Sequence, residues 1–123
     1  MEKKPVATDN EESATLLGIT KAQDPPRLLL ETPCLSTLLP AYDFVRAEFG
    51  AEIGGAIHLE YRRYLVTMEG KNLGRLFRAI HVNEIAAITE WKEDAKTKPM
   101  DCFVTRIVVA PLREDDSAED EAL

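Results

Sequence analysis

Cysteine and histidine are scarce in this sequence, and a long apolar run is missing. Aromatic residues make up 7% of the 123 residues, and only two cysteines and two histidines are present. No run approaches the roughly 18 apolar residues that a membrane-spanning helix needs. We therefore expect no membrane contact.

The first residues of the chain also lack a targeting pattern. They lead into further acidic residues rather than into an apolar stretch. Such a start is typical neither of a secretory signal nor of a transit peptide. The sequence therefore predicts a cytoplasmic location.

The two cysteines are too far apart to form a local motif. Cys34 and Cys102 lie 68 positions apart, and both have apolar neighbours. Apolar surroundings favour two buried free thiols, with a long-range disulfide as the alternative. A catalytic thiol has less support, because neither histidine lies near a cysteine in the sequence.

Motifs for phosphate binding, nucleophilic catalysis or metal binding are missing. Gly70-Lys71 lacks the glycine that a phosphate loop needs five positions before Gly70, where Leu65 stands. The sequence contains no Gly-x-Ser-x-Gly elbow. We therefore expect no cofactor and no metal, and favour a protein without enzymatic activity.

His58 and Glu60 keep one chemical alternative open. On a strand the two side chains share a face about 7 Å apart. An imidazole and a carboxylate at that spacing could supply two metal ligands or an acid–base pair. A polar outer face of a half-exposed strand is the favoured interpretation, because no further ligands are offered nearby in the sequence.

Charge is concentrated at the two ends of the chain. Of the net charge of −7, the first 26 residues contribute five acids against three lysines, and residues 114–121 contribute six acids and no base, which leaves +1 for the middle. A run of like charge repels itself and cannot be buried. We therefore predict a flexible N-terminal arm over residues 1–26, a globular domain over 27–113 and a disordered acidic tail over 114–123.

The acidic tail is a candidate contact for a partner. Its simplest role is to promote solubility. The alternative is that it engages a basic partner or shields a basic face of its own domain. The six carboxylates belong to Glu114, Asp115, Asp116, Glu119, Asp120 and Glu121.

Alternation of apolar and polar residues predicts the strands. It is found over residues 57–62, 64–68, 85–91 and 102–109, and a further short strand fits the leucines at 28–30. The first two of these strands are expected to form a hairpin, with one continuous, bulged strand as the alternative. Apolar residues on both faces of the last strand indicate an interior strand or one that meets another subunit.

Helical spacing predicts two helices. The stronger pattern, over residues 73–82, places Leu73, Leu76, Phe77 and Ile80 on one face. The Asn72 side chain is expected to cap its start, and Asn83 to end it in the left-handed conformation.

A second, short helix is predicted over residues 40–49. Pro40 suits a first helical turn, and Gly50 suits the position after the last one. The residues that share a face in this helix are Tyr42, Val45 and Phe49.

These elements predict an α+β fold in one small domain. A sheet of about four strands, mostly antiparallel, would carry the helix over 73–82 on one face, with the second short helix near its N-terminal side. The order of the strands stays open.

Basic residues gather in the middle of the chain. Five of them fall within 17 residues that contain a single acid, Glu69. If the hairpin tip and the outer helix face share one surface, that surface could bind phosphates or an acidic protein segment. A solvated helix face is the favoured alternative. The residues are Arg62, Arg63, Lys71, Arg75 and Arg78.

A small core without a recognisable catalytic group favours a protein–protein interaction module or a small subunit of an oligomeric assembly. Its partner would be another protein or its own copy. One alternative is a regulator that uses the basic face or the acidic tail to bind either nucleic acid or an enzyme that acts on nucleic acid. It has less support because the protein is acidic overall. A small enzyme with a spatially assembled site is the second alternative.

Overall fold

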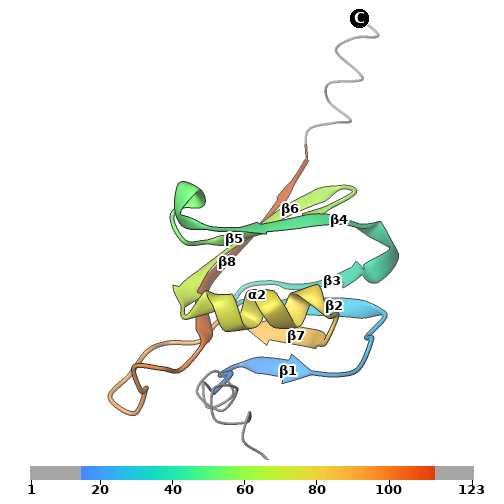
Figure 1. The fold of residues 1–123 in the computed structure, drawn as a ribbon. Helices are drawn as coiled ribbons and strands as arrows, with labels where there is room; N and C mark the ends of the chain where they lie inside the picture. Colours follow the sequence, from blue (N-terminus) through green and yellow to red (C-terminus); the bar gives the residue numbers. More distant parts are fainter. Residues whose placement is uncertain (1–14, 113–123) are drawn as a thin grey trace, which may run out of the picture.

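Residues 15–112, which the computed structural model describes, fold into two four-stranded sheets and one α-helix (Figure 1). The elements in chain order are β1 (Ile19–Lys21), β2 (Arg27–Glu31), β3 (Ser36–Pro40), the 3-10 turn η1 (Ala41–Asp43), β4 (Phe44–Phe49), the 3-10 turn η2 (Ala51–Ile53), β5 (Ile57–Tyr61), β6 (Tyr64–Lys71), α2 (Leu73–His81), β7 (Ile85–Thr89) and β8 (Phe103–Pro111).

The strands divide between the sheets in an order that the sequence did not reveal. The first sheet has the order β1-β7-β2-β3, and the second has the order β4-β5-β6-β8. Among the strand pairs of the described residues, only β2–β7 is parallel, and the other strand pairs are antiparallel. The α+β class and the antiparallel character are therefore confirmed, whereas the prediction of a single sheet of about four strands is wrong.

Two sheets form because each has one apolar face that must be covered. Leu28 and Leu30 on β2 are buried, as are Leu59 on β5 and Val66 on β6. These side chains belong to one cluster that also contains Leu76 of α2. The core therefore lies between the two sheets, and the helix completes it.

The expected hairpin between β5 and β6 is confirmed. Glu60 lies opposite Leu65, which leaves Arg62 and Arg63 at the tip. The Arg62 N–H donates to the Asp43 carbonyl (2.8 Å), and the Leu112 N–H donates to the Arg63 carbonyl (2.9 Å). These bonds from neighbouring segments hold a turn whose residue types are not those that favour tight hairpins.

The helix predicted over residues 40–49 is wrong. Residues 41–43 form a single 3-10 turn, and β4 follows at once. The same residues fit a strand, because Arg46 and Glu48 alternate with Ala47 and Phe49, and β5 satisfies backbone groups of this segment. Forming the first turn of a helix costs free energy, and a helix of only ten residues makes few hydrogen bonds to offset that cost. Pairing with β5 is therefore the more stable arrangement.

The helix predicted over residues 73–82 is confirmed as α2. Leu73 and Leu76 are buried, and Phe77 and Ile80 pack against the core. Asn83 has a φ of 55°, so it ends the helix in the left-handed conformation as expected.

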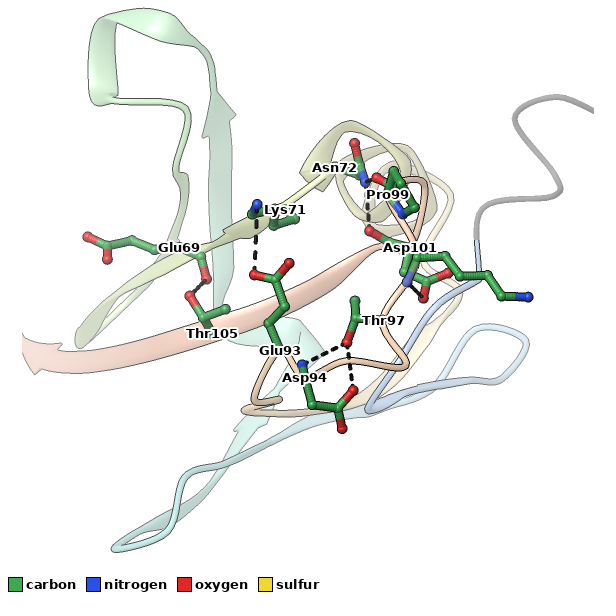
Figure 2. Close-up of polar contacts among 10 residues, drawn as sticks. Glu69, Lys71, Asn72, Glu93, Asp94, Thr97, Pro99, Asp101 and Thr105 are labelled. Carbon is green, nitrogen blue, oxygen red and sulfur yellow. Dashed lines mark hydrogen bonds and ion pairs between the residues drawn. The ribbon is translucent and has the colours of Figure 1, made fainter.

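The expected capping role of Asn72 is wrong. Its own φ is 56°, and its side chain makes no hydrogen bond to the helix. Instead, Nδ2 donates to the carbonyls of Pro99 (2.8 Å) and Asp101 (2.6 Å), as Figure 2 shows. Asn72 therefore ties the start of α2 to the loop that precedes β8.

Part of the predicted N-terminal arm belongs to the fold. Within residues 1–26, strand β1 pairs antiparallel with β7, and Leu16 forms a parallel bridge with Cys102. The prediction of a flexible arm therefore does not hold for residues 19–21, since they pair with β7 as an edge strand of the first sheet. Residues 1–14 and the predicted acidic tail lie outside the described residues.

Candidate functional site

The five basic residues of the sequence prediction lie at separate places. Arg62 and Arg63 form the tip of the β5–β6 hairpin, and Lys71 ends β6 at its other end. Arg63 and Lys71 are eight positions apart along the strand, which corresponds to about 26 Å. Arg75 and Arg78 lie on α2, which starts beside the Lys71 end. The structure therefore does not bring the hairpin tip and Lys71 together.

Arg62 and Lys71 each lie near an acidic side chain. Arg62 Nε lies 3.8 Å from a carboxylate oxygen of Asp43. Lys71 Nζ lies 3.8 Å from a carboxylate oxygen of Glu93, and Figure 2 shows this pair above the loop that precedes β8. Exposed pairs of this length contribute little to stability. They do reduce the positive charge that these two residues offer to a phosphate.

His58 and Glu60 lie on the outer face of the second sheet. Glu60 pairs with Arg46 of β4 (3.1 Å between Nε and Oε1), and His58 lies opposite Glu48. All four line a shallow depression of about 280 Å³. Among the described residues, no three His, Cys, Asp or Glu side chains are close enough to hold a metal ion. This arrangement supports the interpretation of a polar outer face.

The two cysteines are free, and their environments differ. Cys102 is buried, as expected, whereas Cys34 is exposed in the turn between β2 and β3, so its predicted burial is wrong. Thr32 caps this turn through its hydroxyl, which accepts from the Cys34 and Leu35 N–H groups. A tight turn at a sheet end leaves its central side chains in solvent.

This difference predicts a difference in thiol reactivity. Burial raises the pKa of the Cys102 thiol to about 11, although the Leu76 N–H and the Arg75 charge counteract part of the rise. At pH 8 we expect a thiol reagent to modify one cysteine per native chain, at Cys34, and both after unfolding in urea. A Cys34→Ser variant should not react until it unfolds. Rapid modification of Cys102 in the native chain would contradict its burial.

The feature that the sequence analysis missed is a set of exposed apolar side chains in the continuous segment from the β2–β3 turn through β4. Of the eleven large apolar side chains exposed in the described part of the chain, six lie between residues 35 and 49. We call this set the β3–β4 edge surface. Its members are Leu35, Leu38, Tyr42, Phe44, Val45 and Phe49.

Both strands of this surface are edge strands. β3 ends the first sheet and β4 ends the second, and η1 joins them directly. Figure 1 shows the two strands one above the other, with η1 at the end where the chain changes sheet. An edge strand presents unpaired N–H and C=O groups, and proteins usually protect such edges. Here the edges combine with exposed apolar side chains.

The two ends of β4 are anchored to the core by aromatic pairs. The Phe44 ring meets Tyr61 edge-on, with centroids 5.5 Å apart, and Phe49 lies 5.5 Å from the Phe77 ring of α2. Such pairs contribute about 0.5–1.5 kcal/mol beyond the area they bury. β4 is therefore held in place from one side while its other edge stays open among the described residues.

The residues on the two sides of Ala47 in β4 are complementary: a base faces an acid across Ala47, and an apolar residue lies beyond each of them. Arg46 and Glu48 flank it on one face of the strand, and Val45 and Phe49 stand beyond them. This pattern is present in the sequence, but it can direct pairing with a second copy only on a strand whose second edge is unpaired. The helix prediction for residues 40–49 concealed it.

The strand β8 does not provide the interior position that its apolar residues predicted. It pairs with β6 and ends the second sheet. Val104 and Ile107 are buried in the core, whereas Val108 points outward and is 40% exposed.

Within residues 15–112, no helix has the length and apolar character needed to cross a bilayer. Comparisons of the chain with protein-family models, with curated proteins and with solved structures find no match.

Proposed function

We propose that this protein is a non-enzymatic interaction module that assembles with a second copy of itself through β4. The observation that carries the proposal is the open edge of β4, whose charges are complementary to those of its own copy. In an antiparallel pair related by a two-fold axis at Ala47, Arg46 of each copy faces Glu48 of the other. The pairing would create one continuous sheet from two protomers.

The energetics of cross-strand pairs favour this arrangement. Opposite charges that face each other on neighbouring strands contribute about 0.2–1 kcal/mol per pair, and the two-fold axis repeats the pair. The same register places Val45 opposite Phe49 on the other face of the strand, so that apolar side chains meet as well. A protective edge usually carries charge of one sign, which would repel a second copy.

The neighbouring apolar side chains supply the remaining contact area. Tyr42, in η1 directly before β4, is 83% exposed, and Val45 of β4 is 53% exposed. Interfaces depend on a buried apolar centre with aromatic anchors, and backbone pairing alone gives limited affinity. The exposed side chains of η1 and β4 offer the apolar contact, and the open edge of β4 offers the backbone pairing.

A charge reversal tests the proposal. In a homodimer of Glu48→Arg, both symmetry-related contacts would place an arginine opposite an arginine. In a homodimer of Arg46→Glu, both would place a glutamate opposite a glutamate. We expect each variant to dissociate the dimer about tenfold to a hundredfold more readily. Light scattering after size-exclusion chromatography should then report the 13.8 kDa monomer in place of twice that mass.

Mixing the two variants supplies the decisive control. A heterodimer of Arg46→Glu with Glu48→Arg restores both opposite-charge pairs, and the double variant restores them within a homodimer. Arg46 also pairs with Glu60, so thermal melts must show that each single variant stays folded. A wild-type protein that is monomeric at the highest attainable concentration would refute the proposal, and so would a mixture that fails to associate.

The nucleic-acid alternative has less support. Arg62 and Lys71 each lie near a carboxylate, and the hairpin tip is far from the Lys71 end of β6. A protein that binds a phosphate backbone needs several cations on one surface. The acidic tail, which was proposed as a second contact, lies outside the described residues.

A further inference from the structure

A pocket opens between the two sheets at the C-terminal end of α2. Its cavity volume is about 270 Å³. Leu28 of β2, Leu59 of β5 and Ile80 of α2 form its apolar lining, and the Phe44 ring stands beside them. We call this cavity the α2-end pocket. It opens where the helix ends and no longer fills the space between the sheets.

The polar groups of the α2-end pocket are cationic or neutral. Arg27 and His81 line it, and no aspartate or glutamate does. Arg27 makes no ion pair with any of the described residues, although it is exposed at the start of β2. Its guanidinium is therefore available to an anion, and the His81 ring offers an N–H donor in any protonation state.

Tyr61 also lines this pocket. Only 5% of the residue is exposed, and burial raises the pKa of its phenol to about 12. The hydroxyl therefore keeps its proton near neutral pH and can donate a hydrogen bond to an anion. The Phe44 ring, which meets Tyr61 edge-on, holds the phenol in its orientation.

The size of the cavity restricts the ligand. A volume of 270 Å³ corresponds to about nine water molecules of liquid. That is below the volume of most pockets for drug-sized molecules or cofactors. A compact body of about ten non-hydrogen atoms matches this volume.

We propose that the α2-end pocket binds a small carboxylic acid with an apolar body, its carboxylate directed at Arg27 and His81 and its body directed at Leu28, Leu59 and Ile80. An arylalkanoic or branched-chain acid has this chemistry. The inference does not depend on self-association through β4. A free acid and a peptide with an apolar C-terminal residue both present a carboxylate next to an apolar group. The experiment below distinguishes these two sources of the ligand.

The experiment titrates the full chain with 3-phenylpropionate and follows amide chemical shifts. The neutral 3-phenylpropanol is the matched probe without charge. We expect the acid to shift the amides of residues that line the pocket, with a dissociation constant of order 1 mM for a ligand of this size. The alcohol should bind about fivefold more weakly, since it lacks the charge-assisted bond.

Two variants and one control locate the site. Arg27→Gln should weaken the acid about fivefold and leave the alcohol unchanged. Ala41→Phe places a ring at an exposed position that lines the pocket and should abolish binding of both probes. Ala51→Phe, an exposed alanine of the other 3-10 turn, is the control and should bind as the wild type does.

The outcomes separate the sources of the ligand. If a tripeptide with a C-terminal phenylalanine competes with the acid at equal or lower concentration, the natural ligand is a peptide terminus; if it does not compete, the ligand is a free acid. Equal binding of acid and alcohol would overturn the proposed role of Arg27. Shifts that persist in Ala41→Phe, or that are absent in the wild type, would overturn the site itself.

Discussion

Replacing Gly70 with alanine is expected to destabilise the protein by about 2–3 kcal/mol, as overpacking against fixed neighbours does. Gly70 lies in β6, where the register with β8 shifts between Glu69 and Gly70. A Cβ at this position would overlap the carbonyl oxygen of Phe103 and would lie 2.8 Å from the Cα of Val104. Both are backbone atoms, so no side-chain rotation can relieve the overlap.

Gly50→Ala is the matched control for this prediction. Gly50 has an extended backbone with a φ of 167°, and a Cβ there would meet no atom within 4 Å. We expect its urea midpoint to match that of the wild type within error, whereas Gly70→Ala should unfold at a clearly lower urea concentration. Equal midpoints for the two variants would mean that β6 and β8 do not approach each other as described.

Truncating Leu76 to alanine is expected to cost about 3 kcal/mol of unfolding free energy. Leu76 is 0% exposed and lies on the face of α2 that packs into the core between the sheets. Its removal leaves a cavity bordered by both sheets, which a two-layer core cannot readily close. A domain of this size has a total stability of about 5–15 kcal/mol, so the loss is a large fraction of it.

Val82→Ala provides the comparison for Leu76→Ala. Val82 follows α2 directly and is 52% exposed, so its truncation should change the unfolding free energy by less than about 0.5 kcal/mol. Denaturation by urea, followed through the helical signal in circular dichroism, measures both variants. A Leu76→Ala protein as stable as Val82→Ala would show that α2 does not complete the core.

Segments with one dominant periodicity were predicted correctly. Helix α2 matches because its four apolar residues repeat at helical spacing and at no other. β5 matches because its burial alternates from Ile57 to Tyr61. In both elements, the residues that the local pattern places on the apolar face are the ones that pack into the core, so no tertiary information was needed.

The segment before β5 was ambiguous, and the wrong element was predicted there. Tyr42, Val45 and Phe49 suit one face of a helix, yet Arg46 and Glu48 also alternate with Ala47 as in a strand. Sequence alone gives no weight to the backbone partner that β5 supplies. The candidate interaction surface was hidden by the same ambiguity, because an edge exists only once the pairing is known.

Asn72 illustrates how a residue with correct local chemistry acquires another role. Asparagine suits both a helix start and the left-handed conformation. Its amide instead reaches the carbonyls of Pro99 and Asp101, which are 27 and 29 positions away. No local pattern contains partners at that distance in the chain.

Local periodicity and composition thus predicted the class of the fold, the helix α2 and the buried face of β5, because these depend on neighbours within a few residues. Long-range pairing alone assigned the strands to two sheets, left β4 at an edge with Arg46 and Glu48 about Ala47, and opened the pocket at the end of α2. Those features arise where segments distant in sequence meet or fail to meet. The free energy of that pairing depends on both partners, so it cannot be read from one segment alone.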